Sequence, residues 1–185
     1  MATEPDPRRA GAEPSDPLTG FATRVDLLAD LAARLDPSSE PSVLAIFHLG
    51  GYREYVELYG SIEGDALLER LARCLGEALA PHATCYRPRR DEFAAIVEAP
   101  GPAAEALLEA TVSALNAAFA ASRIALSFGT ALLPDEAFDP IDALSLADTR
   151  LYLVAAGRQA RERRAAPRGV GDGDRATGAV RPAER

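Results

Sequence analysis

Short, continuous apolar runs that alternate with segments of helical periodicity constrain the fold of this 185-residue chain most. The run over 43–47, Val-Leu-Ala-Ile-Phe, contains no polar residue, which is typical of a buried central strand. Before it, residues 21–35 place apolar side chains three or four positions apart, which predicts a helix that ends at Asp36-Pro37. A chain that interleaves the two patterns forms neither an all-α nor an all-β fold.

The same two patterns continue towards the C-terminus. Helical spacing predicts four more helices, over 52–59, 62–79, 102–121 and 141–156, and Gly157 is expected to stop the last one. Strands are predicted over 84–87, 92–98 and 124–132, with a tight turn through Pro88, Arg89 and Arg90 between the first two. The order, one helix and then β-α-α-β-β-α-β-α, predicts an α+β domain with a mixed, largely antiparallel sheet covered by helices.

Charge and composition divide the chain into a core and two tails. Arginine supplies all 20 positive charges against 28 acidic residues, so the net charge is −8, which argues against general nucleic-acid binding. Residues 157–185 reverse this balance with eight arginines and four acids. We expect a disordered tail over 1–15, one folded domain over 16–164, and a disordered Arg/Gly/Pro-rich tail over 165–185, because the tails hold too few large apolar residues to fold.

Targeting signals and cysteines add little. No apolar run approaches the roughly 20 residues of a membrane span, and the N-terminus lacks the apolar segment of a secretory signal. Two cysteines, Cys74 and Cys85, do not make a disulfide framework. We therefore expect a cytoplasmic protein without a membrane partner.

Five short motifs, in one order and at fixed spacings, resemble the GGDEF domain of diguanylate cyclases. They are Asp16-Pro17-Leu18-Thr19-Gly20, Gly64-Asp65-Ala66-Leu67-Leu68, Arg87-Pro88-Arg89-Arg90-Asp91-Glu92-Phe93, Ser127-Phe128-Gly129, and Ala147-Asp148 followed by Leu151-Tyr152 and Gly157-Arg158. The resemblance implies the ferredoxin-type core of the nucleotidyl cyclases. It also implies an activity, the condensation of two GTP molecules into cyclic di-GMP by two facing domains.

The resemblance implies a metal site formed by carboxylates, because metal ions neutralise phosphate charge in such reactions. Asp91 and Glu92 match the signature carboxylates and are predicted to be vestigial catalytic residues, with Asp91 also a metal ligand. The other implied ligand position holds His48, and imidazole suits Mg²⁺ poorly. We therefore expect Mg²⁺ as a cofactor only if the nucleotide site still functions. His48 either contacts a metal or nucleotide, or forms local hydrogen bonds.

The implied nucleotide contacts are partly replaced. Val56, which has no hydrogen-bonding side chain, stands where active members have an asparagine that contacts guanine. Asp65 matches the second base contact, with helix capping as its alternative role. Arg89 and Arg90 replace the two signature glycines, where they would fill the nucleotide's space or bind an anionic ligand.

The closing helix and the inhibitory site differ from the family pattern as well. The closing segment lacks the phosphate-binding lysine of active members, and Arg158 is left either to contact phosphates or to complement the helix dipole. Ala80 and Ala83 stand at the positions of the family's inhibitory Arg-x-x-Asp pair.

The replacements of the first metal ligand, the asparagine that contacts guanine, both signature glycines and the phosphate-binding lysine fall on four segments but within one implied site, so the sequence predicts a degenerate, catalytically inactive GGDEF domain. Such a domain would act as a regulatory module that binds GTP, another guanine nucleotide, a protein partner or a second copy of itself. The alternative is an active diguanylate cyclase with an atypical site. A different nucleotide chemistry on the same fold is a third hypothesis.

Overall fold

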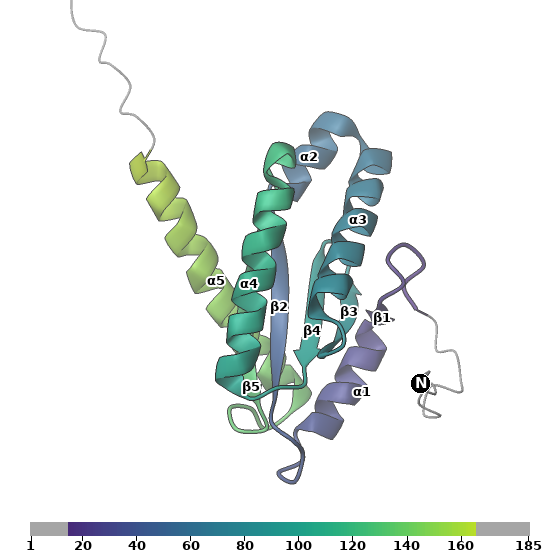
Figure 1. The fold of residues 1–185 in the computed structure, drawn as a ribbon, viewed down its shortest axis with the longest axis vertical. Helices are drawn as coiled ribbons and strands as arrows, with labels where there is room; N and C mark the ends of the chain where they lie inside the picture. Colours follow the sequence, from purple (N-terminus) through teal and green to yellow (C-terminus); the bar gives the residue numbers. More distant parts are fainter. Residues whose placement is uncertain (1–14, 166–185) are drawn as a thin grey trace, which may run out of the picture.

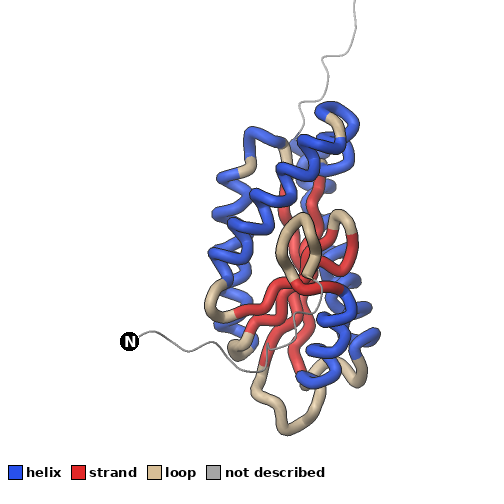
Figure 2. The backbone as a smooth tube through the Cα atoms, turned by 90° about the vertical axis from the view of Figure 1, so that its right-hand side faces the viewer, coloured by secondary structure: helices blue, strands red, loops and turns tan. Residues whose placement is uncertain are grey.

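The computed structural model describes residues 15–165, so the predicted tails fall almost entirely outside the described residues. A five-stranded sheet in the order β1-β3-β4-β2-β5 forms the centre (Figures 1 and 2). The strands are β1 (Ala22–Thr23), β2 (Ser42–Gly50), β3 (Ala83–Arg89), β4 (Glu92–Val97) and β5 (Ala125–Leu133). All neighbouring strands are antiparallel except β1, which runs parallel to β3. The predicted α+β class with a mixed, largely antiparallel sheet is confirmed.

Helices cover both faces of this sheet (Figure 2). They are α1 (Arg24–Arg34), α2 (Tyr52–Tyr59), α3 (Ser61–Leu79), α4 (Gly101–Ala118) and α5 (Pro140–Ala165), with a short 3₁₀ helix, η2 (Ala120–Ser122). Apart from the two ends of the domain, the predicted bounds lie within three residues of these.

The uninterrupted apolar sequence of β2 follows from the burial of both faces of this central strand. Side chains alternate across a sheet, and here both faces are covered. Val43, Ala45 and Phe47 lie in the core formed with α3 and α4. Leu44 and Ile46 lie in a second core formed with α1 and α5. A strand with two buried faces has no position for a polar residue until it passes the helices.

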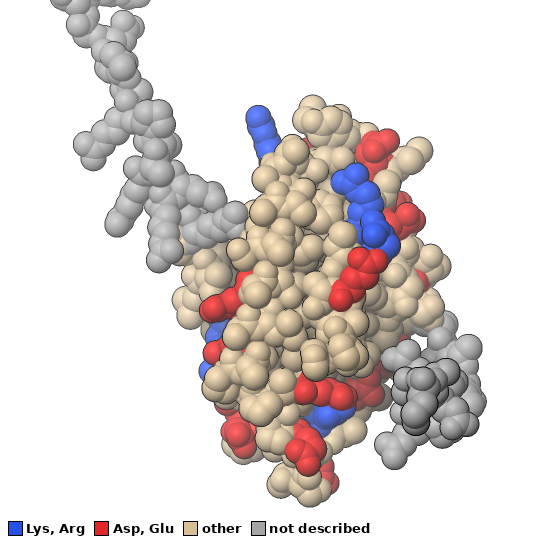
Figure 3. Space-filling model, viewed as in Figure 1, with Lys and Arg blue, Asp and Glu red and all other residues tan. Residues whose placement is uncertain are grey.

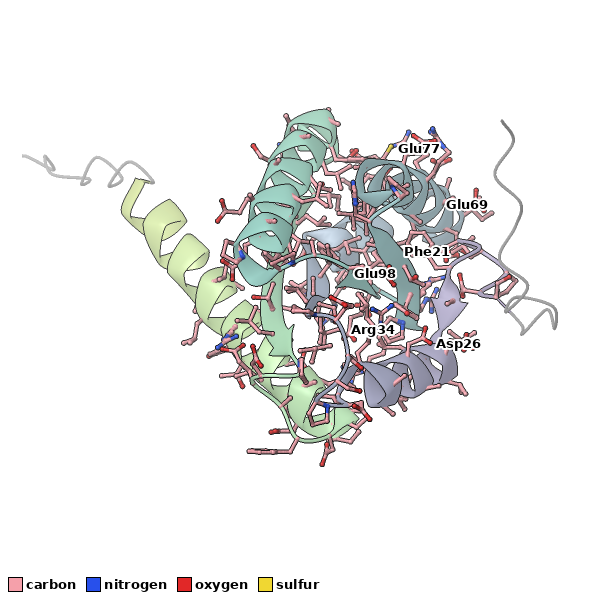
Figure 4. All side chains as sticks on the ribbon, turned by 60° about the horizontal axis from the view of Figure 1, so that its bottom comes forward. Phe21, Asp26, Arg34, Glu69, Glu77 and Glu98 are labelled. Atoms are coloured by element: carbon pink, nitrogen blue, oxygen red, sulfur yellow. The ribbon has the colours of Figure 1, made fainter. Side chains whose placement is uncertain are left out.

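The predicted helix over 21–35 begins too early. Its start is set by a capping box in which the Thr23 side chain accepts from the Asp26 backbone and the Asp26 side chain accepts from the Thr23 backbone, so α1 begins after Thr23. Phe21, which has the spacing of a helical residue, instead packs edge-on against Phe93, 5.7 Å between ring centroids. Phe21 is labelled in Figure 4, where it lies beside α3.

The predicted stop of the last helix at Gly157 is wrong, because α5 continues to Ala165. A glycine inside a helix is disfavoured by about 1 kcal/mol relative to alanine, which is too little to end it. The continuation carries α5 beyond the sheet (Figure 1).

Charged side chains are dispersed over the surface. Figure 3 shows separate acidic and basic groups on one face rather than a continuous basic patch. Some form ion pairs that join elements, as Arg34 of α1 does with Glu98 after β4 (Figure 4). Within residues 15–165, no helix is long and apolar enough to cross a membrane.

Two glycines give a paired test of how α5 packs on the sheet. A Cβ at Gly129 of β5 would lie 2.2 Å from the Ala147 carbonyl oxygen and 2.3 Å from the Leu151 nitrogen, whereas a Cβ at Gly157 would meet nothing within 4 Å. We expect Gly129→Ala to lower the free energy of unfolding by roughly 1–3 kcal/mol. Gly157→Ala should raise it or leave it unchanged. Urea denaturation of both variants checks this, and equal stability of the two would contradict the packing.

Candidate functional site

The β3–β4 hairpin carries the signature motif. The predicted turn through residues 88–90 is displaced, because Pro88 and Arg89 belong to β3 and the turn itself is Arg90 and Asp91. An extra residue in β3 forms a bulge between the Tyr86 and Arg89 pairs, which accommodates this register. Neither arginine has a positive φ, so the loss of the two glycines imposes no backbone strain on the turn.

Arg87 fixes the tip of this hairpin from behind. Its Nε and one terminal nitrogen donate to the Arg90 carbonyl oxygen, at 3.1 and 2.6 Å. Its other terminal nitrogen donates to Asp16 at 2.8 Å, and only 7% of the Arg87 side chain is exposed. The same Asp16 oxygen accepts from the backbone and the hydroxyl of Thr19. One guanidinium therefore ties the N-terminal turn over 16–20 to the signature turn.

Electrostatics reflect this contact. Burial alone would raise the pKa of Asp16, but the hydrogen bonds from Arg87 and Thr19 outweigh it and the pKa lies below its ordinary value. The carboxylate form is therefore the one that the fold stabilises.

The hydroxyl of Tyr52, at the start of α2, lies among several predicted site residues. Burial raises its pKa, and the negative charges of Asp65 and Asp91 raise it further, while Arg90 and Arg87 oppose them. The charges of Asp65 in α3 and of Arg90 and Asp91 in the hairpin therefore all lie within electrostatic range of the Tyr52 hydroxyl.

Helices α2 and α3 pack closely where the Val56 side chain lies against Gly64. A Cβ at Gly64 would lie 2.6 Å from a methyl carbon of Val56 and 3.1 Å from the Tyr52 hydroxyl oxygen. Val56, at the implied base-reading position, is thus pressed against the α3 backbone. Asp65 is the fifth residue of α3, and that helix has Gly60 as its cap with no side-chain cap bond. The alternative role of Asp65 as a helix cap is therefore wrong.

Arg89 and Glu92 form a second group on the other side of the hairpin. They make an ion pair at 3.0 Å and line a cavity of about 150 Å³ with Arg24 of α1 and Asp148 of α5. Burial raises the pKa of Glu92; the charge of Arg89 opposes this, and Asp148 adds to it. The two predicted anion-binding arginines therefore differ, because Arg89 is paired with a carboxylate whereas the Arg90 side chain has no ion-pair partner among the described residues.

His48 lies near the end of β2, opposite Glu92 of β4 and Ser127 of β5. Its side chain is exposed, as is that of Asp91. Among residues 15–165, no cluster of three or more His, Cys, Asp or Glu residues could hold a metal ion. An exposed imidazole and one carboxylate do not fit Mg²⁺, which prefers several oxygen ligands.

Arg158 lies within α5, but its side chain is outside the described residues. The other predicted residues divide between the Tyr52 side and the Glu92 side of the hairpin. Sequence reasoning missed Tyr52, whose pKa responds to the charges of Asp65, Arg90 and Asp91. It also missed Arg24 and Asp148, which line the same cavity as Glu92. Alternation along β4 could have indicated that Phe93 and Glu92 face opposite sides of the sheet.

A sequence model described as "Diguanylate cyclase, GGDEF domain" matches residues 14–163. The chain belongs to the GGDEF family. An uncharacterized signaling protein of Caulobacter vibrioides is 32% identical over 147 residues, which cover 74% of this chain and 18% of that protein. The GGDEF chain described here thus spans less than a fifth of that relative.

Solved structures agree with this assignment. A sensory box/GGDEF family protein from Caulobacter crescentus has 29% identity and a TM-score of 0.66, over 77% of this chain and 98% of that one. The GGDEF domain of DgcB from the same organism, in complex with c-di-GMP, has a TM-score of 0.67 over 77% of this chain and 90% of that one. At 22% identity it shows the shared fold alone.

Replacing Arg87 tests the contact that joins the two turns. Arg87→Met leaves Asp16 without its charged partner and should lower the free energy of unfolding at pH 7 by roughly 3 kcal/mol. Because the folded pKa of Asp16 is below its unfolded value of 3.8, this contribution is present above pH 3.8 and is lost as the pH falls through the folded pKa. Urea denaturation at pH 7 and near pH 3 should show the difference shrinking. Arg53→Met, which removes an exposed pair with Glu57, is the control and should change little.

Glu92 gives a test with the opposite sign. Its folded pKa is raised above the ordinary value of 4.5, so its contribution is greatest below that value and falls as the pH rises through the folded pKa. We expect Glu92→Gln to be at least as stable as the native chain at pH 7 despite losing the Arg89 ion pair, and to lose this advantage near pH 4. A clear loss of stability at pH 7, measured by urea denaturation, would show that the ion pair outweighs burial.

Proposed function

We propose that this GGDEF domain does not condense GTP and that it acts as a regulatory module in cyclic di-GMP-type signalling. Its ligand would be an anion that contacts the hairpin tip, either the phosphates of a guanine nucleotide or an anionic protein surface. The observation that carries the proposal is the contact of Val56 with Gly64 under the Tyr52 hydroxyl. A guanine base would need hydrogen-bonding groups and free space there, and the chain supplies an apolar side chain in tight contact.

The charged groups support the same conclusion. The implied metal position holds the exposed His48, which brings no negative charge. Arg90 extends from the turn without an ion-pair partner among the described residues, so its guanidinium is available to an anion. A site with a free cation but a poor metal-binding donor set favours binding over phosphoryl transfer.

The alternative, an active diguanylate cyclase, rests on one observation. The charges of Asp65 and Asp91 both raise the pKa of Tyr52, so two of the carboxylates implied by the family lie within electrostatic range of one hydroxyl. Formation of cyclic di-GMP from GTP distinguishes this alternative from the proposal.

Calorimetric titration with GTP and with cyclic di-GMP, each with and without Mg²⁺, tests the proposal when it is followed by chromatography of the GTP sample. We expect no cyclic di-GMP product. Any nucleotide binding should be independent of Mg²⁺ and weakened at least about tenfold by Arg90→Ala, because the free guanidinium would be lost. Cyclic di-GMP in the GTP sample would overturn the proposal in favour of the alternative.

A reversion variant controls for an assay that fails to detect binding. His48→Asp, Val56→Asn, Arg89→Gly and Arg90→Gly, combined in one chain, restore the residues that the family pattern implies. This variant should bind GTP in the presence of Mg²⁺ more tightly than the native chain does. If native and reverted chains bind GTP and Mg²⁺ equally, the replaced residues do not determine nucleotide binding, and the proposal loses its structural basis.

A further inference from the structure

The C-terminal part of α5 extends beyond the sheet on which the rest of the helix packs. At Leu151 the helix backbone passes directly over Gly129 of the sheet. Beyond it, Tyr152, Leu153 and Val154 are 73%, 64% and 51% exposed. Figures 1 and 4 both show this part of the helix projecting away from the domain.

Such an extension is not stable by propensity alone. An isolated helix of fewer than about 12–15 residues is marginal in water, and Gly157 weakens this one further. Most helices gain their stability from packing an apolar face. Tyr152 and Val154 lie 100° to either side of Leu153 around the helix, so about half of its circumference is apolar and exposed at this point, which favours a packing partner.

We propose that the partner is a second copy of this chain, with the two α5 helices packed antiparallel and Leu153 meeting its counterpart at a two-fold axis. At 100° per residue, the exposed positions Thr149, Ala156 and Gly157 share the face of Leu153. Their small side chains allow the two backbones to approach closely around the central leucines. The pairing is isologous, so it closes as a dimer.

Charge selects the antiparallel direction. The N-terminal half of α5 carries Asp142, Asp148 and Arg150, which pairs with Glu136, whereas Arg158, Arg161, Arg163 and Arg164 follow Gly157 with a single acid, Glu162. Parallel helices would place like charges side by side. Antiparallel helices centred on Leu153 place the Asp142 position opposite that of Arg164, because both are eleven residues from Leu153.

Sedimentation velocity of the full chain over a micromolar concentration series tests the pairing. We expect a reversible dimer that high salt weakens. Leu153→Glu would bring two carboxylates together at the axis and should weaken dimerisation at least about tenfold. Ile62→Glu is the matched control, because Ile62 is 83% exposed on α3 and should leave the dimer unchanged. A monomer at every concentration, or a dimer insensitive to Leu153→Glu, would overturn the proposal.

Cysteine crosslinking tests the direction. A disulfide needs Cα atoms within about 7 Å. Leu153→Cys should therefore crosslink on oxidation above the background from the native Cys74 and Cys85. Ala160→Cys should not, since antiparallel helices would hold the two 160 positions about 21 Å apart along the axis. A crosslink through position 160 would indicate parallel helices and would contradict the proposed antiparallel pairing. The pairing does not depend on whether the domain binds nucleotide.

Discussion

The arrangement of the candidate site depends on the guanidinium of Arg87. It is almost fully buried and divides its donors between Asp16 and the Arg90 carbonyl oxygen. A buried charge must be paired, and among the described residues the Arg87 guanidinium donates to these two partners. The N-terminal turn and the signature turn are therefore held in one geometry. The motifs at residues 16–20 and 87–93 act as a single structural unit although they are far apart in the sequence.

The side chains of the β3–β4 hairpin lie on two sides of it. The charges of Arg90 and Asp91 affect the pKa of the Tyr52 hydroxyl, whereas Arg89 and Glu92 form an ion pair in a cavity that α1 and α5 also line. On the Tyr52 side, a methyl group of Val56 packs against Gly64. The chain thus keeps the scaffold of the GGDEF family, and the position that the family pattern implies for a guanine contact holds an apolar side chain.

The sequence predicted those parts of the fold that periodicity and burial determine. The apolar run at 43–47 lies between two helix layers, and the leucines of α3 face the core as their spacing indicated. It could not predict β1, because two residues carry no periodic signal and the Thr23 cap decides where α1 begins. The sequence also did not indicate that α5 continues past Gly157, because the low helix propensity of a single glycine is a weak constraint. The family motifs predicted a candidate site, but the placement of Arg89 and Arg90 depends on a bulge in β3.

The most direct test of the closed base position is nuclear Overhauser spectroscopy on methyl-labelled chain, with and without GTP and Mg²⁺. The structure predicts cross-peaks from the Val56 methyl groups to the Gly64 α-protons and to the Tyr52 ring, unchanged by nucleotide. Loss of these cross-peaks on adding GTP, with new ones between the Val56 methyl groups and guanine H8, would show that the site opens to receive a base and would contradict the account.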